Sequence, residues 1–174
     1  MVGPVLFEDV QVTNLRTAGN LGGWLSGALF KHVILAGKIG GLVLDSNRWI
    51  DPLQEAGKTE VRVFRDSERD FYVSTDWALD IRGAELRSLD WRLDIPTRLV
   101  RRDPETQVVV KRERALEGAW RKIPLEDAVA FGLQDMLLRD QAERIFAAPR
   151  ASKRFKDELA SLALLRKEGI AEPD

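Results

Sequence analysis

Residue types that often carry catalysis are scarce in this sequence. His32 is the only histidine among 174 residues, and cysteine is absent. A triad with a histidine base or a zinc site would rest on His32 alone, while thiolate nucleophiles and disulfides are excluded. His32 lies among apolar neighbours in LFKHVIL, which favours a structural or surface role. We therefore predict no catalytic residue, no metal site and no cofactor.

Arginine and carboxylate side chains in the segment RLVRRDPETQ offer a second kind of chemistry. Arg101 and Arg102 lie close to Glu105 along the chain. Because guanidinium groups bind phosphate or carboxylate through paired hydrogen bonds, this cluster could hold a small anion. The alternative is the charged tip of a β-hairpin, which keeps a sheet edge soluble. We favour the hairpin tip.

The glycine-rich segment GNLGGWLSGALFKHVILAGKIGG does not match a nucleotide-binding motif. In a P-loop the Gly-Lys pair is followed by Ser or Thr, whereas Gly37-Lys38 is followed by Ile39. The dinucleotide pattern Gly-x-Gly-x-x-Gly is also missing. The glycines are better explained as corners between short strands.

Overall charge argues against two classes of partner. The sequence has 27 basic and 28 acidic residues, and a net charge of -1 does not attract nucleic acid or anionic lipid. The longest uncharged stretch, residues 17–30, is too short to span a bilayer. The N-terminus does not resemble a secretory signal, and a chain without cysteine suits a reducing compartment. We expect a cytoplasmic protein.

A spacing of five residues recurs in the first half of the chain. In ALDIRGAELRSLDWR, Ile81, Leu86 and Trp91 are each preceded by an acidic residue. The segment FEDVQVTNLR has the same form. An apolar run with the same spacing but without the acidic residues comprises Trp24, Leu29, Ile34, Ile39 and Leu44. Five matches neither the helical period nor the strand period, so a different geometry is indicated.

This pattern resembles the pentapeptide-repeat family, whose unit centres on Leu or Phe preceded by Asp or Asn. The resemblance implies a right-handed, four-sided β-solenoid in which each side directs one side chain inward. It also implies an interaction protein without cofactors. The alternative for residues 74–93 is an amphipathic helix that begins after Ser74 or Thr75 and ends at Pro96. Gly83 and the scattered apolar positions weigh against that helix.

Hairpins and helices are expected outside the repeats. Alternating residues Val61, Val63, Phe71 and Val73 flank a polar turn and predict one β-hairpin. A second hairpin is predicted at TRLVRRDPETQVVVKRE, with its turn at residues 103–106.

Two helices are predicted in the last third. The first begins at Pro124, ends before Pro149, and has apolar residues at helical spacing. Its charged residues are expected on an exposed face: Asp135, Arg139, Asp140, Glu143 and Arg144. The second is capped by Ser152 and stopped by Gly169. Its apolar stripe comprises Phe155, Leu159, Leu162 and Leu165.

Together these features predict an α+β fold in a single domain. A short, irregular right-handed β-solenoid-like body with hairpins would occupy residues 1–123, and two C-terminal helices in residues 124–174 would cap it. We expect a non-enzymatic protein-binding or regulatory protein whose partner is another protein or a second copy, as a homodimer. The alternative is a small-molecule-binding protein or enzyme that uses carboxylate and arginine side chains such as Arg101, Arg102 and Glu105.

Overall fold

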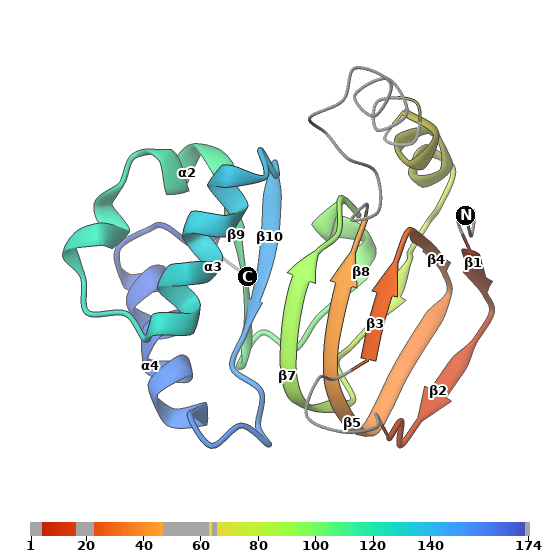
Figure 1. Ribbon diagram of the computed structural model, residues 1–174, viewed down its shortest axis with the longest axis horizontal. Helices are drawn as coiled ribbons and strands as arrows, with labels where there is room; N and C mark the ends of the chain where they lie inside the picture. The colour runs from red at the N-terminus through yellow and green to blue at the C-terminus, as the bar shows by residue number, and fades with distance from the viewer. Residues whose placement is uncertain (1–4, 17–22, 47–62, 64–65, 173–174) are drawn as a thin grey trace.

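The computed structural model describes residues 5–16, 23–46, 63 and 66–172. Figure 1 shows two halves side by side. One half is a curled arrangement of strands from the first part of the chain. The other half is a two-stranded sheet covered by helices from the last part.

Parallel strands form the first half, and the 13-residue strand β5 (Val33–Asp45) lies at its centre. All pairs in this half are parallel, and β1 pairs with β4 while β8 extends the sheet beyond β6. The remaining strands are β1 (Val5–Glu8), β2 (Gln11–Thr13), β3 (Gly23–Ser26), β4 (Ala28–Lys31), β6 (Leu79–Asp80), β7 (Ala84–Arg92) and β8 (Val100–Arg101).

Strand β5 changes direction at Gly37, and this bend curls the sheet. Residues before Gly37 pair with β2 and β6, whereas residues after it pair with β7 and β3. Gly37 has a φ of +66°, a conformation that side chains other than glycine rarely adopt. Asn14 Oδ1, which accepts a hydrogen bond from the Lys38 N–H at 2.9 Å, occupies the space that a Cβ would need.

Replacing Gly37 with alanine is expected to destabilise the protein by about 1 to 2 kcal/mol for the left-handed backbone alone. A Cβ at Gly37 would also lie 2.5 Å from Asn14 Oδ1, which adds to the loss. Gly83→Ala is the matched control, because its Cβ would make ordinary contact with Ala36 at 3.8 Å. Urea unfolding measures both variants. Equal stability of the two variants would show that Gly37 is not required at the bend.

The core of the curled half is filled from positions that the five-residue spacing marks. Ile39, Leu44, Ile81, Leu86 and Trp91 are each at most 2% exposed. The spacing fails earlier in the sheet, where Trp24 is 45% exposed and Leu29 and Ile34 are only partly buried. The periodic residues therefore identify buried positions only from Ile39 of β5 onward.

The second half is an antiparallel pair, β9 (Gln107–Lys111) and β10 (Glu143–Ala147), with helices packed on it. Its separate core includes Val108, Leu133, Met136 and Leu162. The helices are α2 (Arg112–Leu116), α3 (Asp127–Leu138) and α4 (Phe155–Lys167), with short 3-10 turns at Thr97–Leu99 and Ala119–Lys122. None of the helices within the described ranges is long and apolar enough to cross a membrane.

The predicted right-handed β-solenoid body capped by two helices is wrong. The structure is a mixed α/β fold that combines a curled parallel sheet, an antiparallel sheet and helices. A solenoid needs short sides separated by corners, whereas β5 continues for 13 residues and pairs with four different strands. Inward side chains at intervals of five also arise on a bent strand, so this spacing does not specify a closed coil.

The first predicted hairpin is also wrong. Residues 66–73 are helical, and Val61 lies outside the described residues. Helical spacing places Glu68 and Tyr72 on the same face, where both are at most 3% exposed. Tyr72 fixes this helix to the sheet, because its hydroxyl accepts a hydrogen bond from the Phe30 N–H at 3.1 Å. Packing against the sheet therefore outweighs the local alternation of apolar residues.

The second predicted hairpin is correct only in its turn. Asp103 O accepts a hydrogen bond from the Gln107 N–H at 2.9 Å, and the Asp103 carboxylate accepts one from the Thr106 hydroxyl at 2.7 Å. The flanking strands do not pair with each other, because β8 pairs with β6 and β9 pairs with β10. The helical alternative for residues 74–93 is wrong as well, since these residues include β6 and β7.

The predicted C-terminal helices are largely confirmed. α3 ends at Leu138, before the predicted end, because residues 143–147 form β10. α4 begins at Phe155, and its N-cap position is Arg154 with no capping side chain, so the predicted cap at Ser152 is wrong. The Ser152 hydroxyl accepts a hydrogen bond from the Arg154 N–H at 3.1 Å, in the turn before the helix. Gly169, with a φ of +66°, follows the end of α4 as expected.

Candidate functional site

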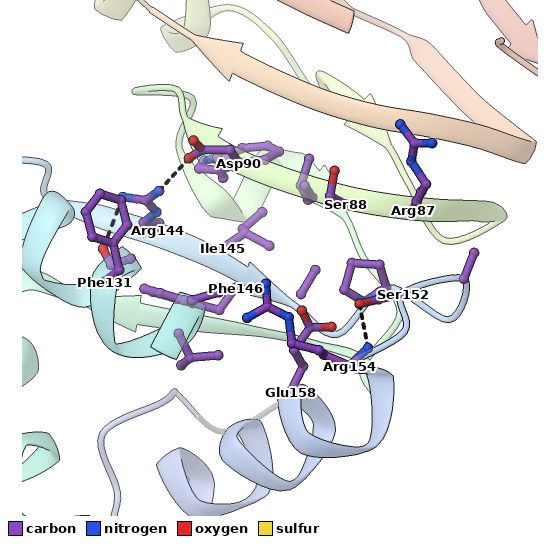
Figure 2. A pocket seen from close by; sticks show the side chains of 18 of the residues that line it. Arg87, Ser88, Asp90, Phe131, Arg144, Ile145, Phe146, Ser152, Arg154 and Glu158 are labelled. Atoms are coloured by element: carbon purple, nitrogen blue, oxygen red, sulfur yellow. Dashed lines mark hydrogen bonds and ion pairs between the residues drawn. The ribbon is translucent and has the colours of Figure 1, made fainter. Parts of the chain in front are cut away.

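A cleft of about 560 Å³ separates β7 from the helical half of the protein. Figure 2 shows Ser88 and Asp90 on β7 along one side, with Ile145 and Phe146 of β10 on the other. The N-terminal part of α3 and the segment leading into α4 complete its walls. The cleft thus lies where elements distant in sequence meet.

Buried ion pairs hold one end of the cleft together. Arg144, on β10, donates from Nη2 to Asp90 at 2.8 Å and from Nη1 to Asp135 at 2.9 Å. Arg144 also donates to the Gly132 carbonyl of α3 at 3.1 Å. Its side chain is only 5% exposed. Arg144 therefore connects β7, β10 and α3.

This network corrects the prediction that Asp135, Arg139 and Arg144 share an exposed helix face. Arg144 lies on β10, and the Asp135 side chain is only 10% exposed. Burial opposes ionisation of Asp135, but hydrogen bonds from Arg144 and Arg139 outweigh it and lower the pKa of the carboxyl. The other two predicted surface carboxylates contact residues distant in sequence: Asp140 pairs with Arg112, and Glu143 accepts a hydrogen bond from the Thr97 N–H.

The opposite end of the cleft contains a second acidic group. Glu158, on α4, is partly buried, and burial raises the pKa of its carboxyl. Its Oε2 atom is buried and has no hydrogen-bond partner within the part of the chain that the structure describes. Arg154 nearby forms an ion pair with Glu126. This end of the cleft is therefore polar, and one of its buried carboxylate oxygens lacks a hydrogen bond.

The cleft is also lined by an exposed aromatic ring and by exposed cations. Phe131, on α3, is 62% exposed although it is a large apolar residue. Figure 2 shows Phe131 beside Arg144 at one end of the cleft and Arg87 toward its other end. Arg87 and Lys153 are exposed, and neither forms an ion pair with any residue in the described ranges. The cleft therefore offers an apolar contact at one end and positive charge away from it.

The arginine and carboxylate residues considered from the sequence do not form a common site. The Arg101 guanidinium lies 4.0 Å from the centre of the Trp77 ring. Arg102 donates to a backbone carbonyl of β9, and Glu105 accepts from Arg150 at 2.9 Å. Each side chain has its own intramolecular contact, so the three are not directed at one ligand.

His32 lies outside the cleft and links three segments of the curled half. Its Nδ1 is 2.9 Å from Asp9 Oδ1, and its Nε2 is 2.7 Å from Asp76 Oδ1. Two carboxylate partners require both nitrogens to carry protons, so the geometry fits the imidazolium form. The hydrogen bonds that His32 donates to Asp76 and then to Asp9 raise the pKa of His32, and the bond to Asp76 also lowers the pKa of Asp76.

Stability is therefore expected to depend on pH through His32. Because its folded-state pKa is raised, the stabilisation is complete below the ordinary value of 6.5 and is lost as pH rises through the raised value. The Asp76 contribution is complete above 3.8 and is lost as pH falls through its lowered value.

The variant His32→Asn tests this dependence. Asparagine tolerates the positive φ of 55° at this position, so the backbone is retained. The difference in unfolding free energy between wild type and variant should be largest from pH 3.8 to 6.5 and should shrink above that range. Urea unfolding across the pH series measures it, and parallel curves would contradict the role of His32.

Comparison with known proteins gives no further information about the site, because no protein-family model, no curated protein and no solved structure matches this chain. Sequence reasoning missed the cleft because its walls come from separate segments. Arg87 and Phe131 carry no local motif. Phe131 stands among apolar residues of α3, between Ala130 and Gly132, so nothing in the sequence distinguishes it from a core position.

Proposed function

We propose that this is a non-enzymatic protein-binding protein of the cytoplasm and that the cleft between β7 and the helical half receives a segment of its partner. The observation that carries the proposal is the exposed ring of Phe131 at a cleft that is also lined by two cations, Arg87 and Lys153, which pair with no carboxylate of the described residues. An exposed aromatic side chain next to a cleft is typical of a binding anchor.

The apolar wall behind Phe131 supports a partner with a large apolar side chain. Val129, Ile145 and Phe146 line the cleft and provide a surface for such a group. Burial of an apolar side chain on this wall would contribute about 1.5 to 3 kcal/mol when it is complete. The cytoplasmic assignment depends on the sequence, since a chain without cysteine suits a reducing compartment.

Affinity capture from native lysate with wild type and two variants tests the proposal. Phe131→Ser removes the anchor from the cleft, whereas Leu138→Ser removes an 87% exposed apolar residue of the same helix that does not line the cleft. We expect a protein that is retained by wild type and by Leu138→Ser and lost with Phe131→Ser. Equal retention by all three would contradict the proposal.

A thermal-shift screen of phosphates and carboxylates tests the alternative of a small-molecule ligand. Under our proposal, no such compound stabilises wild type in a way that depends on Phe131. Stabilisation that disappears in Phe131→Ser but persists in Leu138→Ser would instead identify the cleft as a small-molecule site.

A further inference from the structure

The charge that the fold leaves unbalanced in the cleft is mainly positive. Arg144 and Arg154 line the cleft, but both are neutralised by carboxylates of the protein itself. Arg87 and Lys153 also line it, are exposed, and form no ion pair within the described ranges. These two cations therefore remain to be neutralised by a ligand.

The carboxylates that line the cleft do not cancel this excess. Asp90 is already shared between two arginines. Glu158 has a buried Oε2 atom, and it forms no ion pair with Arg87 or Lys153 in the part of the chain that the structure describes. Two unpaired cations thus stand against one unpaired carboxylate.

The unpaired cations and the exposed ring lie toward different ends of the cleft. Figure 2 shows Arg87 and Ser152 toward one end and Phe131 at the other. Lys153 directly follows Ser152 in sequence and lines the same cleft. At the Phe131 end, the positive charge of Arg144 is already balanced. A ligand would therefore find an apolar contact at one end and unneutralised charge at the other.

The cleft admits side chains and does not admit an added strand. Trp91 of β7 is only 1% exposed, and β10 packs against β7. The volume of about 560 Å³ lies within the range of pockets that hold small groups. A partner segment would therefore be recognised through its side chains.

On these grounds we propose that the partner segment is acidic and that it places carboxylate side chains at Arg87 and Lys153 and a large apolar side chain at Phe131. The inference rests on the proposed function and specifies the chemistry of its partner. Guanidinium and ammonium groups form charge-assisted hydrogen bonds with carboxylates, and the same charges exclude basic partners. The balanced charge of the whole chain, at -1, favours such a segment over a nucleic acid.

The probes are acetylated and amidated peptides with a leucine at one end, two glutamates at the other, and a serine-glycine spacer of varied length between them. Each peptide is titrated into the full-length ¹⁵N-labelled protein. We expect chemical-shift changes at the amides of both Phe131 and Arg87. Affinity should be highest at one spacer length, because both ends bind together only when the spacer spans the cleft.

Two control peptides separate the contributions of the ends. One has lysine in place of each glutamate, and the other has serine in place of the leucine. Each should bind at least about tenfold more weakly, the effect of losing one good interaction. Binding of the glutamate peptide should also weaken as the salt concentration rises.

Charge-reversal variants locate the carboxylates of the peptide. Arg87→Glu and Lys153→Glu should each weaken binding of the glutamate peptide about tenfold. Lys156→Glu is the matched control, because Lys156 is exposed on α4 and does not line the cleft. The double variant Arg87→Glu/Lys153→Glu should instead prefer the lysine peptide, whereas a misfolded protein would bind neither peptide.

A thymidine oligonucleotide is titrated in parallel as an acidic ligand of another class. The inference is overturned if the lysine peptide binds as well as the glutamate peptide, if no glutamate peptide binds, or if the oligonucleotide binds more tightly. Chemical-shift changes remote from the cleft would also overturn it.

Lysate capture distinguishes failure of this inference from failure of the proposed function. A captured protein that depends on Phe131 but is retained by the double variant would remove this inference and leave the proposed function intact. Equal capture by wild type and Phe131→Ser would remove the proposed function itself.

Discussion

Replacing Arg144 with methionine is expected to reduce the free energy of unfolding by about 1.5 to 3 kcal/mol. The guanidinium is almost fully buried and pairs with both Asp90 and Asp135. Asp90 keeps its ion pair with Arg92 and Asp135 keeps its ion pair with Arg139, so the loss comes from the hydrogen bonds that Arg144 donates to the two carboxylates and to the Gly132 carbonyl. Urea unfolding monitored by tryptophan fluorescence measures it.

The control for Arg144→Met is Arg114→Met. Arg114 pairs with Glu117, and because both side chains are more than half exposed, at 53% and 59%, solvent screens the pair. The expected loss for Arg114→Met is therefore about 0 to 1 kcal/mol. If the two variants were equally stable, the ion pairs between β7, β10 and α3 would not hold the two halves together.

Replacing Trp91 with alanine should also reduce the free energy of unfolding by about 3 to 5 kcal/mol, because it empties the largest fully buried side-chain site. Trp91 is 1% exposed and packs in the core of the curled half. The remaining tryptophans report the transition, so guanidinium unfolding followed by fluorescence and circular dichroism is suitable.

Trp91→Phe separates ring packing from hydrogen bonding. The buried Nε1 of Trp91 has no hydrogen-bond partner in the described structure, so removal of this N–H breaks no bond. The phenylalanine variant should therefore lose clearly less stability than the alanine variant. Equal losses would mean that the site cannot accommodate a smaller ring.

The sequence predicts the inner face of the curled sheet better than its architecture. Ile81, Leu86 and Trp91 are buried as their spacing indicates, because inward positions recur wherever the strand bends at similar intervals. The spacing does not determine how long a strand continues between bends. Whether β5 continues through Gly37 depends on contacts with Asn14 and with strands far away in sequence.

Local signals were sufficient for α4, with its apolar spacing and the glycine after its end, and for the turn at residues 103–106. They were insufficient for β9 and β10, whose pairing joins residues from Lys111 with Glu143 to Gln107 with Ala147, far apart along the chain. The cleft was beyond sequence reasoning for the same reason. Its cations, Arg87 and Lys153, are separated widely along the chain, and only the tertiary fold places them on one rim.

The two strands β9 and β10 couple the unfolding of the two cores. Their side chains alternate between the cores: Val109 and Ile145 pack with the curled half, while Val108, Val110 and Phe146 pack with the helices. If either core unfolds, one face of the β9–β10 pair loses its packing. The other core packs on the opposite face of the same two strands, so it is destabilised as well. The whole chain should lose its structure in a single concerted transition, and a ligand bound at the cleft should raise the melting temperature of both halves together.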